Sequence, residues 1–156
     1  MNVKEFKYDK VNAFSKLLID YSLNKDHFSD LISNYPSIKN FKNQISLKSK
    51  NYNNEFRKVI VEEINNQYKD IELSADQKSN ISKILDKKTF TVTTGHQLNL
   101  FTGPLYFIYK IISVINLSEI LKKNYSQYNF VPIYWMATED HDFEEINNFS
   151  FKEKKF

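Results

Sequence analysis

The sequence contains no cysteine, and only two of its 156 residues are glycine. The lack of cysteine excludes disulfide bonds and thiolate zinc sites within these residues. A chain of this length ordinarily has about eleven glycines, because glycine makes up roughly 7% of average proteins. Glycine is therefore kept only where the backbone requires it. Both glycines, Gly95 and Gly103, fall in one short stretch.

A strong charge and a long apolar run are also lacking. The 22 basic and 19 acidic residues leave a net charge of +3, which is too balanced to predict nucleic-acid binding. Arg57 is the single arginine, so a phosphate site cannot be built from a cluster of arginine forks. The N-terminus has no signal-peptide run, and polar residues interrupt the most apolar stretch, residues 105–121. We therefore expect no membrane span and a cytoplasmic protein.

Apolar residues in positions 1–88 recur at helical spacing. The clearest amphipathic stripe, expected to pack in a core, consists of Phe56, Ile60, Ile64 and Tyr68. Ser74-Ala75-Asp76-Gln77 has the form of a capping box, which predicts the start of a further helix. The basic residues expected on a solvated face are Lys48, Lys50, Arg57 and Lys58. His27 lies in a polar stretch, where we expect a surface position without a role.

At residue 89 the pattern changes. Residues 89–94 alternate and are β-branched, which predicts a strand, and residues 130–136 form the continuous apolar run typical of a strand buried on both faces. Between them, a loop from Gly95 to Gly103 leads into a helix with Pro104 in its first turn. The apolar stripe of that helix is broad, which predicts cover on more than one side: Leu105, Ile108, Ile111, Ile112, Val114 and Ile115.

Strand, helix and strand within about fifty residues predict a βαβ unit with parallel strands. We therefore predict an α/β protein in two parts. Residues 1–88 form a helical N-terminal segment, and residues 89–156 form the first βαβ unit of a Rossmann-like parallel sheet, which is incomplete. Ligands of open α/β sheets bind beyond the carboxyl ends of the strands, so a site is expected there.

The first polar cluster, Thr94-Gly95-His96-Gln97, follows the first predicted strand. Gly95 permits a sharp turn and a close backbone approach. The helix that begins near Pro104 points its N-terminus toward the same place, which favours a phosphate or carboxylate, and Lys110 is within reach of such a group. The loop matches neither Gly-x-Gly-x-x-Gly nor the Walker pattern, so a tight turn without a ligand is an equal alternative.

The second polar cluster, Glu139-Asp140-His141-Asp142, follows the second predicted strand. Adjacent carboxylates and an imidazole can act as base, acid or cation ligands. The alternative is an acidic helix start with Thr138 as its N-cap. No further ligand source is visible, so we predict no metal site. If the strands are parallel neighbours, both clusters open into one crevice.

Two stretches around these clusters resemble the bacillithiol-synthesis cysteine-adding enzymes, also called cysteine ligases. The first runs from Val92 to Tyr106 and is followed by Tyr109-Lys110, and the second covers residues 130–137 and 139–146. The resemblance implies a Rossmann-like core, distantly similar to class I aminoacyl-tRNA synthetases, and a long C-terminal coiled coil. It also implies the last step of bacillithiol synthesis, in which an amide bond joins cysteine to glucosaminyl-malate.

The resemblance leads to expectations for the site. Because amide formation from a free carboxylate is uphill in water, we expect ATP as cofactor. The expected nucleotide-binding residues are Thr94, Gly95, Gly103 and Lys110. The expected catalytic residues are His96, Gln97, Asp140, His141 and Asp142. Of these, His96 and Gln97 would stabilise charge on the activated carboxyl group. The acidic cluster would orient or deprotonate the amine.

Members of this family are several times longer than this chain, which ends soon after the second motif. We therefore expect an N-terminal fragment that lacks the remaining strands and the coiled coil. Whether it is active alone, and whether the full-length form is a homodimer, stay open. Two alternatives also stay open: an inactive fragment or helical partner-binding module, and a related ATP-dependent ligase with another amine acceptor.

Overall fold

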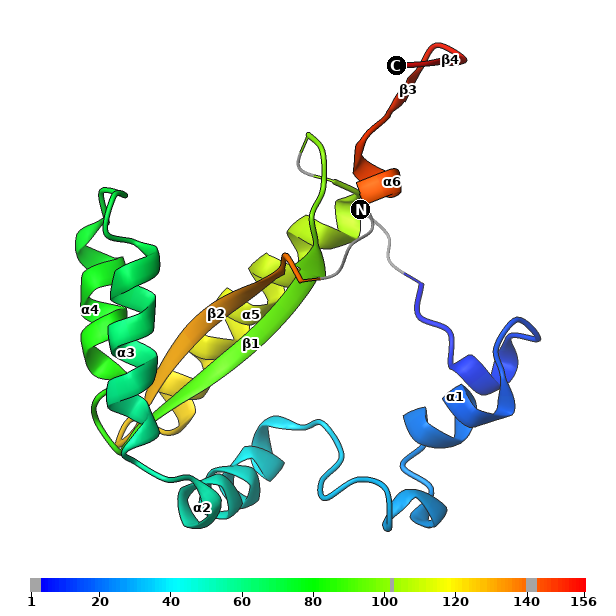
Figure 1. The fold of residues 1–156 in the computed structure, drawn as a ribbon. Helices are drawn as coiled ribbons and strands as arrows, with labels where there is room; N and C mark the ends of the chain where they lie inside the picture. Colours follow the sequence, from blue (N-terminus) through cyan, green and yellow to red (C-terminus); the bar gives the residue numbers. More distant parts are fainter. Residues whose placement is uncertain (1–3, 102, 140–142) are drawn as a thin grey trace. The chain divides into compact units, whose positions relative to one another are not determined.

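The computed structural model describes residues 4–101, 103–139 and 143–156, and its elements follow the predicted order (Figure 1). The elements before residue 89 are η1 (Tyr8–Lys10), α1 (Lys16–Ser22), η2 (Asp26–Phe28), η3 (Ile38–Asn40), α2 (Phe41–Asn51), α3 (Phe56–Gln67) and α4 (Ala75–Lys83). The elements that follow are β1 (Thr89–Gln97), α5 (Leu105–Asn124), β2 (Asn129–Ala137), α6 (Phe143–Ile146), β3 (Ser150–Phe151) and β4 (Lys154–Lys155). All the elements described before residue 89 are helical, as the sequence predicts.

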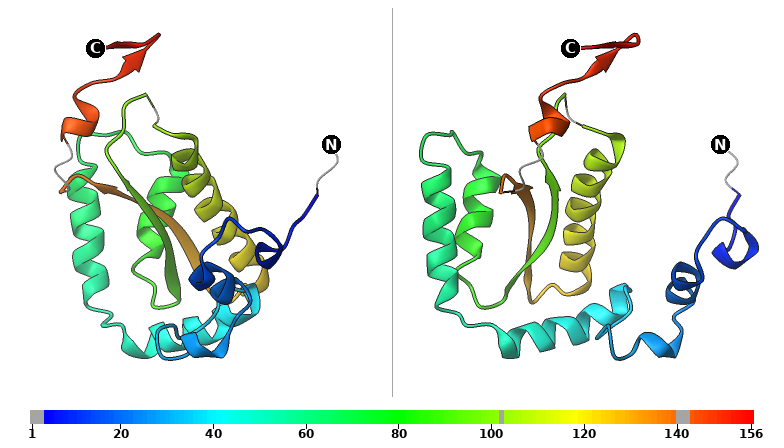
Figure 2. Two further views of the ribbon diagram at one scale, coloured as in Figure 1. Left: turned by 90° about the vertical axis from the view of Figure 1, so that its right-hand side faces the viewer. Right: turned by 45° about the vertical axis from the view of Figure 1, so that its right-hand side comes forward.

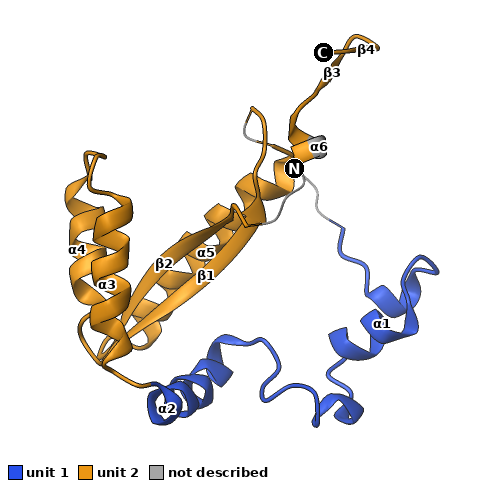
Figure 3. Cartoon of the chain, in the orientation of Figure 1, with its two compact units in different colours: residues 1–52 blue, residues 53–156 orange. Residues whose placement is uncertain are grey.

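The chain divides into two compact units, Met1–Tyr52 and Asn53–Phe156 (Figure 3). This division falls earlier than residue 88, where the secondary structure changes from helices to the βαβ unit. Helices α3 and α4 belong to the second unit because they pack against each other and α4 also contacts β2. The predicted division of the chain into residues 1–88 and 89–156 stays a prediction.

Arg57 ties α3 to the end of α4. Its Nη1 donates to the backbone oxygen of Ile84 at 2.9 Å, and its Nε donates to Oδ1 of Asn54 at 3.0 Å. The side chain is buried, so the expectation of a solvated position is wrong for this residue. A buried guanidinium is tolerated where its donors meet acceptors, and here they do.

Helix α4 begins as the sequence predicts. Ser74 Oγ accepts from the backbone N–H of Gln77 at 3.3 Å, and Gln77 Oε1 accepts from the backbone N–H of Ser74 at 2.9 Å, which completes the capping box. The stripe on α3 is helical too, but Phe56, Ile60 and Tyr68 are exposed in the described structure. The expected core packing of that stripe is therefore wrong within the described residues.

Strands β1 and β2 pair in parallel, which confirms the central prediction of the sequence. The register runs from Thr89 opposite Asn129 to Gln97 opposite Ala137, and Figure 1 shows the strands side by side. Because β2 supplies a partner for every residue of β1 up to Gln97, the strand continues past its predicted end. The prediction that a loop begins at Gly95 is therefore wrong.

Gly95 is required by the spacing of the two strands. A Cβ atom at this position would lie 2.8 Å from the backbone oxygen of Trp135 and 3.1 Å from its Cβ. A separation of 2.8 Å is closer than real Cβ atoms come to a backbone atom. The predicted close backbone approach is confirmed, whereas the predicted sharp turn is wrong because Gly95 is part of the strand.

Helix α5 packs against both strands, and Figure 2 shows it running alongside them. The side that packs on the sheet includes the buried residues Ser118 and Leu121. Four residues of the predicted apolar stripe are exposed in the described structure: Leu105, Ile108, Ile112 and Ile115. Both faces of this helix carry apolar residues at helical spacing, so the pattern cannot say which face the sheet covers. The expected cover on a second side is wrong within the described residues.

Burial changes along β2. Phe130 and Val131 near its start are buried, whereas Trp135 and Met136 near its end are exposed. The strand is therefore a core element at one end only, and its carboxyl end carries exposed side chains. None of the helices in the described part of the chain is long and apolar enough to cross a membrane.

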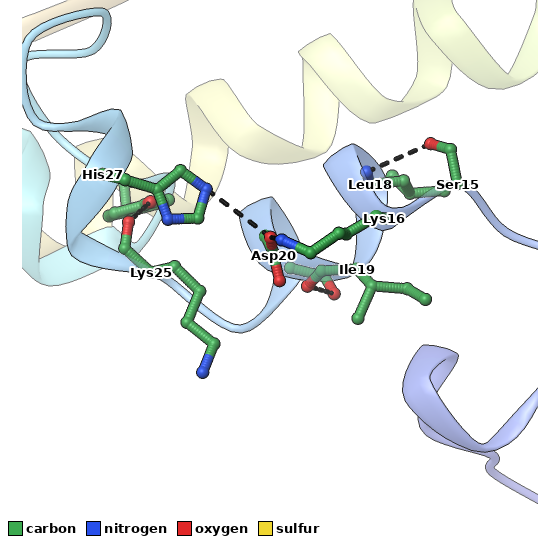
Figure 4. A network of polar contacts seen from close by, with 9 residues as sticks. Ser15, Lys16, Leu18, Ile19, Asp20, Lys25 and His27 are labelled. Carbon is green, nitrogen blue, oxygen red and sulfur yellow. Dashed lines mark hydrogen bonds and ion pairs between the residues drawn. The ribbon is translucent and has the colours of Figure 1, made fainter.

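In the first unit, α1 carries a small polar network (Figure 4). Ser15 caps the helix by accepting from the backbone N–H of Leu18 at 3.3 Å. Lys16 Nζ donates to Oδ2 of Asp20 at 2.7 Å, and His27 Nε2 lies 3.6 Å from the same oxygen. His27 is exposed, as expected, but the sequence did not reveal its partner Asp20.

The Asp20 network predicts a pH dependence. The hydrogen bond from Lys16 holds the pKa of the Asp20 carboxyl below its ordinary value of 3.8, against an opposing effect of desolvation. A lowered pKa in the folded state stabilises the fold above the unfolded-state pKa, and this contribution is lost as pH falls through the lowered value. An NMR titration should place Asp20 below 3.8, and Lys16→Gln should raise its pKa. An Asp20 pKa that is unmoved by Lys16→Gln contradicts this account. The control variant is Asp30→Asn, in which the pKa of Asp20 should stay unchanged.

The contact at Gly95 predicts the cost of adding a methyl group. Gly95→Ala should lower the free energy of unfolding by about 1–3 kcal/mol, because the two strands must separate to admit the Cβ atom. Thr93→Ala, at an exposed position of the same strand, should stay within about 1 kcal/mol of wild type. Urea denaturation of both variants measures the difference. Equal stabilities of the two variants would show that the strands have room at Gly95.

Candidate functional site at the carboxyl end of strand β1

The carboxyl ends of the two strands lie side by side. His96 is opposite Met136 and Gln97 is opposite Ala137, so the turn that begins at Thr138 starts beside the first polar cluster. The predicted shared edge is therefore confirmed as far as the structure describes it. Asp140, His141 and Asp142 of the second cluster lie outside the described residues.

His96 is the centre of a hydrogen-bonded cluster. Its Nε2 lies 2.8 Å from the hydroxyl oxygen of Tyr106 in the first turn of α5. Its Nδ1 lies 2.9 Å from Nδ2 of Asn99 and 3.1 Å from the backbone oxygen of Gln97. Both ring nitrogens are therefore engaged, one by the loop after β1 and one by the helix.

Asn99 determines which tautomer the neutral ring adopts. Nδ2 of Asn99 donates to the backbone oxygen of Gln97 at 2.8 Å, which identifies the amide group that faces His96 as the NH₂ group. We assign the ring proton to Nε2, because Nδ1 lies closer to this donor, at 2.9 Å, than to the backbone oxygen of Gln97, at 3.1 Å. His96 therefore donates from Nε2 to the hydroxyl oxygen of Tyr106.

Gly103 makes room for Asn99. Its φ of +65° is in the left-handed region, which glycine adopts without strain. A Cβ atom there would lie 2.7 Å from Cγ of Asn99, so any other residue would displace the side chain that orients His96. Both glycines of the chain thus serve this site: Gly95 through the strand spacing, and Gly103 through the loop.

Lys110 reaches the same end of β1. Its Nζ donates to the backbone oxygen of Gly95 at 3.2 Å and lies 5.5 Å from the centre of the Tyr106 ring. Thr94 pairs with Tyr134 in the sheet and is half-buried. The structure therefore brings Thr94, Gly95, Lys110 and the His96 cluster to one place.

Two aromatic residues, Phe107 and Tyr134, contact the end of β1 at His96. Phe107 lies edge-on to His96 and to Tyr134, with ring centres 6.0 Å and 5.4 Å apart. The hydroxyl group of Tyr134 donates to the backbone oxygen of His96 at 3.3 Å. Burial raises the pKa of Tyr134 above its ordinary value of 10.0, so this hydroxyl keeps its proton at neutral pH.

The described part of the second cluster forms a turn. Thr138 donates its backbone N–H to the oxygen of Met136 at 2.8 Å, and Trp135 Nε1 donates to Oε1 of Glu139 at 3.3 Å. Glu139 lies in a turn and the next helix begins at Phe143. The acidic first turn that Thr138 would cap falls mostly on residues 140–142, which lie outside the described residues, so that alternative stays a prediction. The residues that the structure describes contain no group of three side chains suited to a metal ion.

Sequence reasoning missed Asn99 and Tyr106 as site residues. Asn99 follows His96 by three residues, a spacing that lets a loop fold back on itself, but asparagine is common in loops for other reasons. Tyr106 belongs to the next helix, and the sequence does not show which side of that helix faces His96.

A parallel βαβ unit whose polar groups gather at the carboxyl ends of its strands is characteristic of a Rossmann-like α/β domain. The family model that describes the bacillithiol biosynthesis protein BshC, N-terminal Rossmann-like domain, matches residues 1–156. The chain belongs to the BshC family.

Several relatives carry the name "Putative cysteine ligase BshC". The protein of Flavobacterium psychrophilum is 58% identical over 149 residues, which cover 95% of this chain and 28% of the relative. That of Flavobacterium johnsoniae is 54% identical, covering 96% of this chain and 28% of the relative. That of Cytophaga hutchinsonii is 45% identical, covering 99% and 29%. The chain therefore spans less than a third of the length of these relatives.

The orientation of Asn99 predicts the tautomer of His96. ¹⁵N NMR of the neutral imidazole should show a protonated Nε2 and an unprotonated Nδ1. In Asn99→Ala, Nδ1 no longer faces a donor and can itself donate to the backbone oxygen of Gln97, so the opposite tautomer should become populated. Asn53→Ala, a loop asparagine outside the site, should leave the spectrum unchanged. A wild-type ring that is already protonated on Nδ1 would contradict the assignment.

Proposed function

We propose that this chain supplies the nucleotide-handling and carboxyl-activating edge of a ligase that joins cysteine to glucosaminyl-malate in the last step of bacillithiol biosynthesis. The observation that carries the proposal is the cluster of His96 and Lys110 at the carboxyl ends of two parallel strands, in a chain of the BshC family. The name of these relatives supports a ligase that acts on cysteine.

ATP would supply the activation that amide formation from a carboxylate needs. An anionic nucleotide group would meet a positive charge at this edge. The ammonium of Lys110 is held at the end of β1 by its hydrogen bond to the backbone oxygen of Gly95. Pro104, the N-cap of α5, offers no side-chain cap to the first turn, so the positive end of a 20-residue helix adds to the same attraction. Thr94, Gly95, Gly103 and Lys110 are therefore the residues that we assign to the nucleotide.

The remaining residues would act on the two substrates. His96 and Gln97, at the end of β1, would stabilise negative charge on the activated carboxyl group. Asp140 or Asp142, together with His141, would orient or deprotonate the attacking amine. The turn after β2 supports this arrangement, because Thr138 directly follows the residue that pairs with Gln97.

The proposed roles predict large losses of activity in the full-length enzyme. His96→Ala and Asp140→Ala should each lower kcat/KM for bacillithiol formation by about 10²–10³-fold, the range for removing a group that stabilises or transfers charge in the transition state. Product formation is followed by chromatography with cysteine, glucosaminyl-malate and ATP as reactants.

The matched control is His27→Ala, because His27 is an exposed histidine of the first unit. It should keep activity within about twofold of wild type. Near-normal turnover in both His96→Ala and Asp140→Ala would remove the proposed roles. Product formation without ATP would remove the nucleotide from the proposal.

A further inference from the structure

A chain of hydrogen bonds at the site ends at Tyr106. In the tautomer assigned above, Asn99 donates to Nδ1 of His96, 2.9 Å away, and Nε2 of His96 donates to the Tyr106 hydroxyl oxygen, 2.8 Å away. Both ring nitrogens of the histidine are used within this chain. A hydroxyl group that accepts one hydrogen bond still has its own O–H to donate. The group that can donate a proton to a ligand is therefore the hydroxyl group of Tyr106, which follows His96 in this chain of hydrogen bonds.

The surroundings of Tyr106 suit a negatively charged ligand atom. The side chain is 51% exposed, so a ligand can approach it. The ammonium of Lys110 lies 5.5 Å from the centre of its ring and is held to the end of β1 by the backbone oxygen of Gly95. A hydroxyl donor next to a cation is an arrangement that favours an oxyanion over a neutral group.

We propose that Tyr106 is a further catalytic residue, whose hydroxyl group donates a hydrogen bond to an oxyanion of the bound reactants. The oxyanion is either a phosphate oxygen of the nucleotide or the substrate carboxylate. In this arrangement Asn99 is a positioning residue, and His96 stabilises the negative charge through the Tyr106 hydroxyl group rather than by touching the ligand itself. The proposal rests on the proposed function and names the atom of that site that contacts the ligand.

The hydrogen bond from His96 changes the donor strength of the Tyr106 hydroxyl group. A hydroxyl group that accepts from an imidazole N–H is polarised, so its own O–H becomes a stronger donor. Asn99 strengthens the effect because it fixes the ring in the tautomer that donates. As negative charge builds on the ligand, the donor is already aimed and no reorganisation is needed.

The test compares Tyr106→Phe with Tyr109→Phe in the full-length enzyme. Tyr109 lies on the same helix and is 60% exposed, so its loss of a hydroxyl group is a matched control. Tyr106→Phe should lower kcat/KM about 10²-fold, mainly through kcat, because the bond strengthens in the transition state. Tyr109→Phe should remain within about twofold. The melting temperature should stay near wild type in both variants, and the ¹⁵N pattern of His96 should stay unchanged in Tyr109→Phe.

Isothermal titration with ATP and, separately, with cysteine identifies the oxyanion. Tyr106→Phe should weaken the binding of one of them about tenfold or more, as expected for loss of a hydrogen bond to a charged group. Weaker ATP binding assigns Tyr106 to a phosphate, and weaker cysteine binding assigns it to the carboxylate of that substrate.

Unchanged turnover together with unchanged affinity for both ligands would overturn the assignment of Tyr106. If the wild-type enzyme forms no bacillithiol, the proposed function fails, and the two titrations still decide whether Tyr106 contacts an oxyanion. A drop in activity accompanied by a lower melting temperature of Tyr106→Phe would also count against the proposal, since it indicates a structural role.

Discussion

The structure of the site depends on the close parallel pairing of β1 and β2. The strands approach so closely at their carboxyl ends that the position opposite Trp135 can hold no Cβ atom, and Gly95 meets that requirement. The same pairing carries β1 on to His96 and Gln97 and directs them to the edge where β2 also ends. A wider spacing would leave the end of β1 unpaired and His96 without a fixed position.

The second constraint is the loop between β1 and α5. Gly103 adopts a left-handed conformation and leaves space for Asn99, which in turn orients the imidazole of His96. The helix then brings Tyr106 to the other side of the ring. The backbone conformation of one glycine therefore influences which nitrogen of the histidine carries a proton. Such dependence is characteristic of sites in which supporting residues orient the reactive ones.

The described structure buries few apolar side chains. Its buried apolar residues are Phe28, Ile45, Ile84, Leu121, Phe130 and Val131. Within the described residues the sheet that carries the site has two strands, each with an open edge, and α5 keeps an exposed apolar stripe. The site is therefore held mainly by local hydrogen bonds and aromatic contacts rather than by a deep core.

The sequence by itself determined the order of the elements, the capping box of α4, the parallel βαβ unit and the common edge at which its two strands end. These features depend on local chemistry and on the period of the apolar pattern. Tertiary structure alone decided that Arg57 is buried, that β1 continues through Gly95, and which face of α5 meets the sheet. It also placed Asn99 and Tyr106 beside His96. Such outcomes depend on contacts between different strands, helices and loops, and neither composition nor periodicity encodes which of these elements meet.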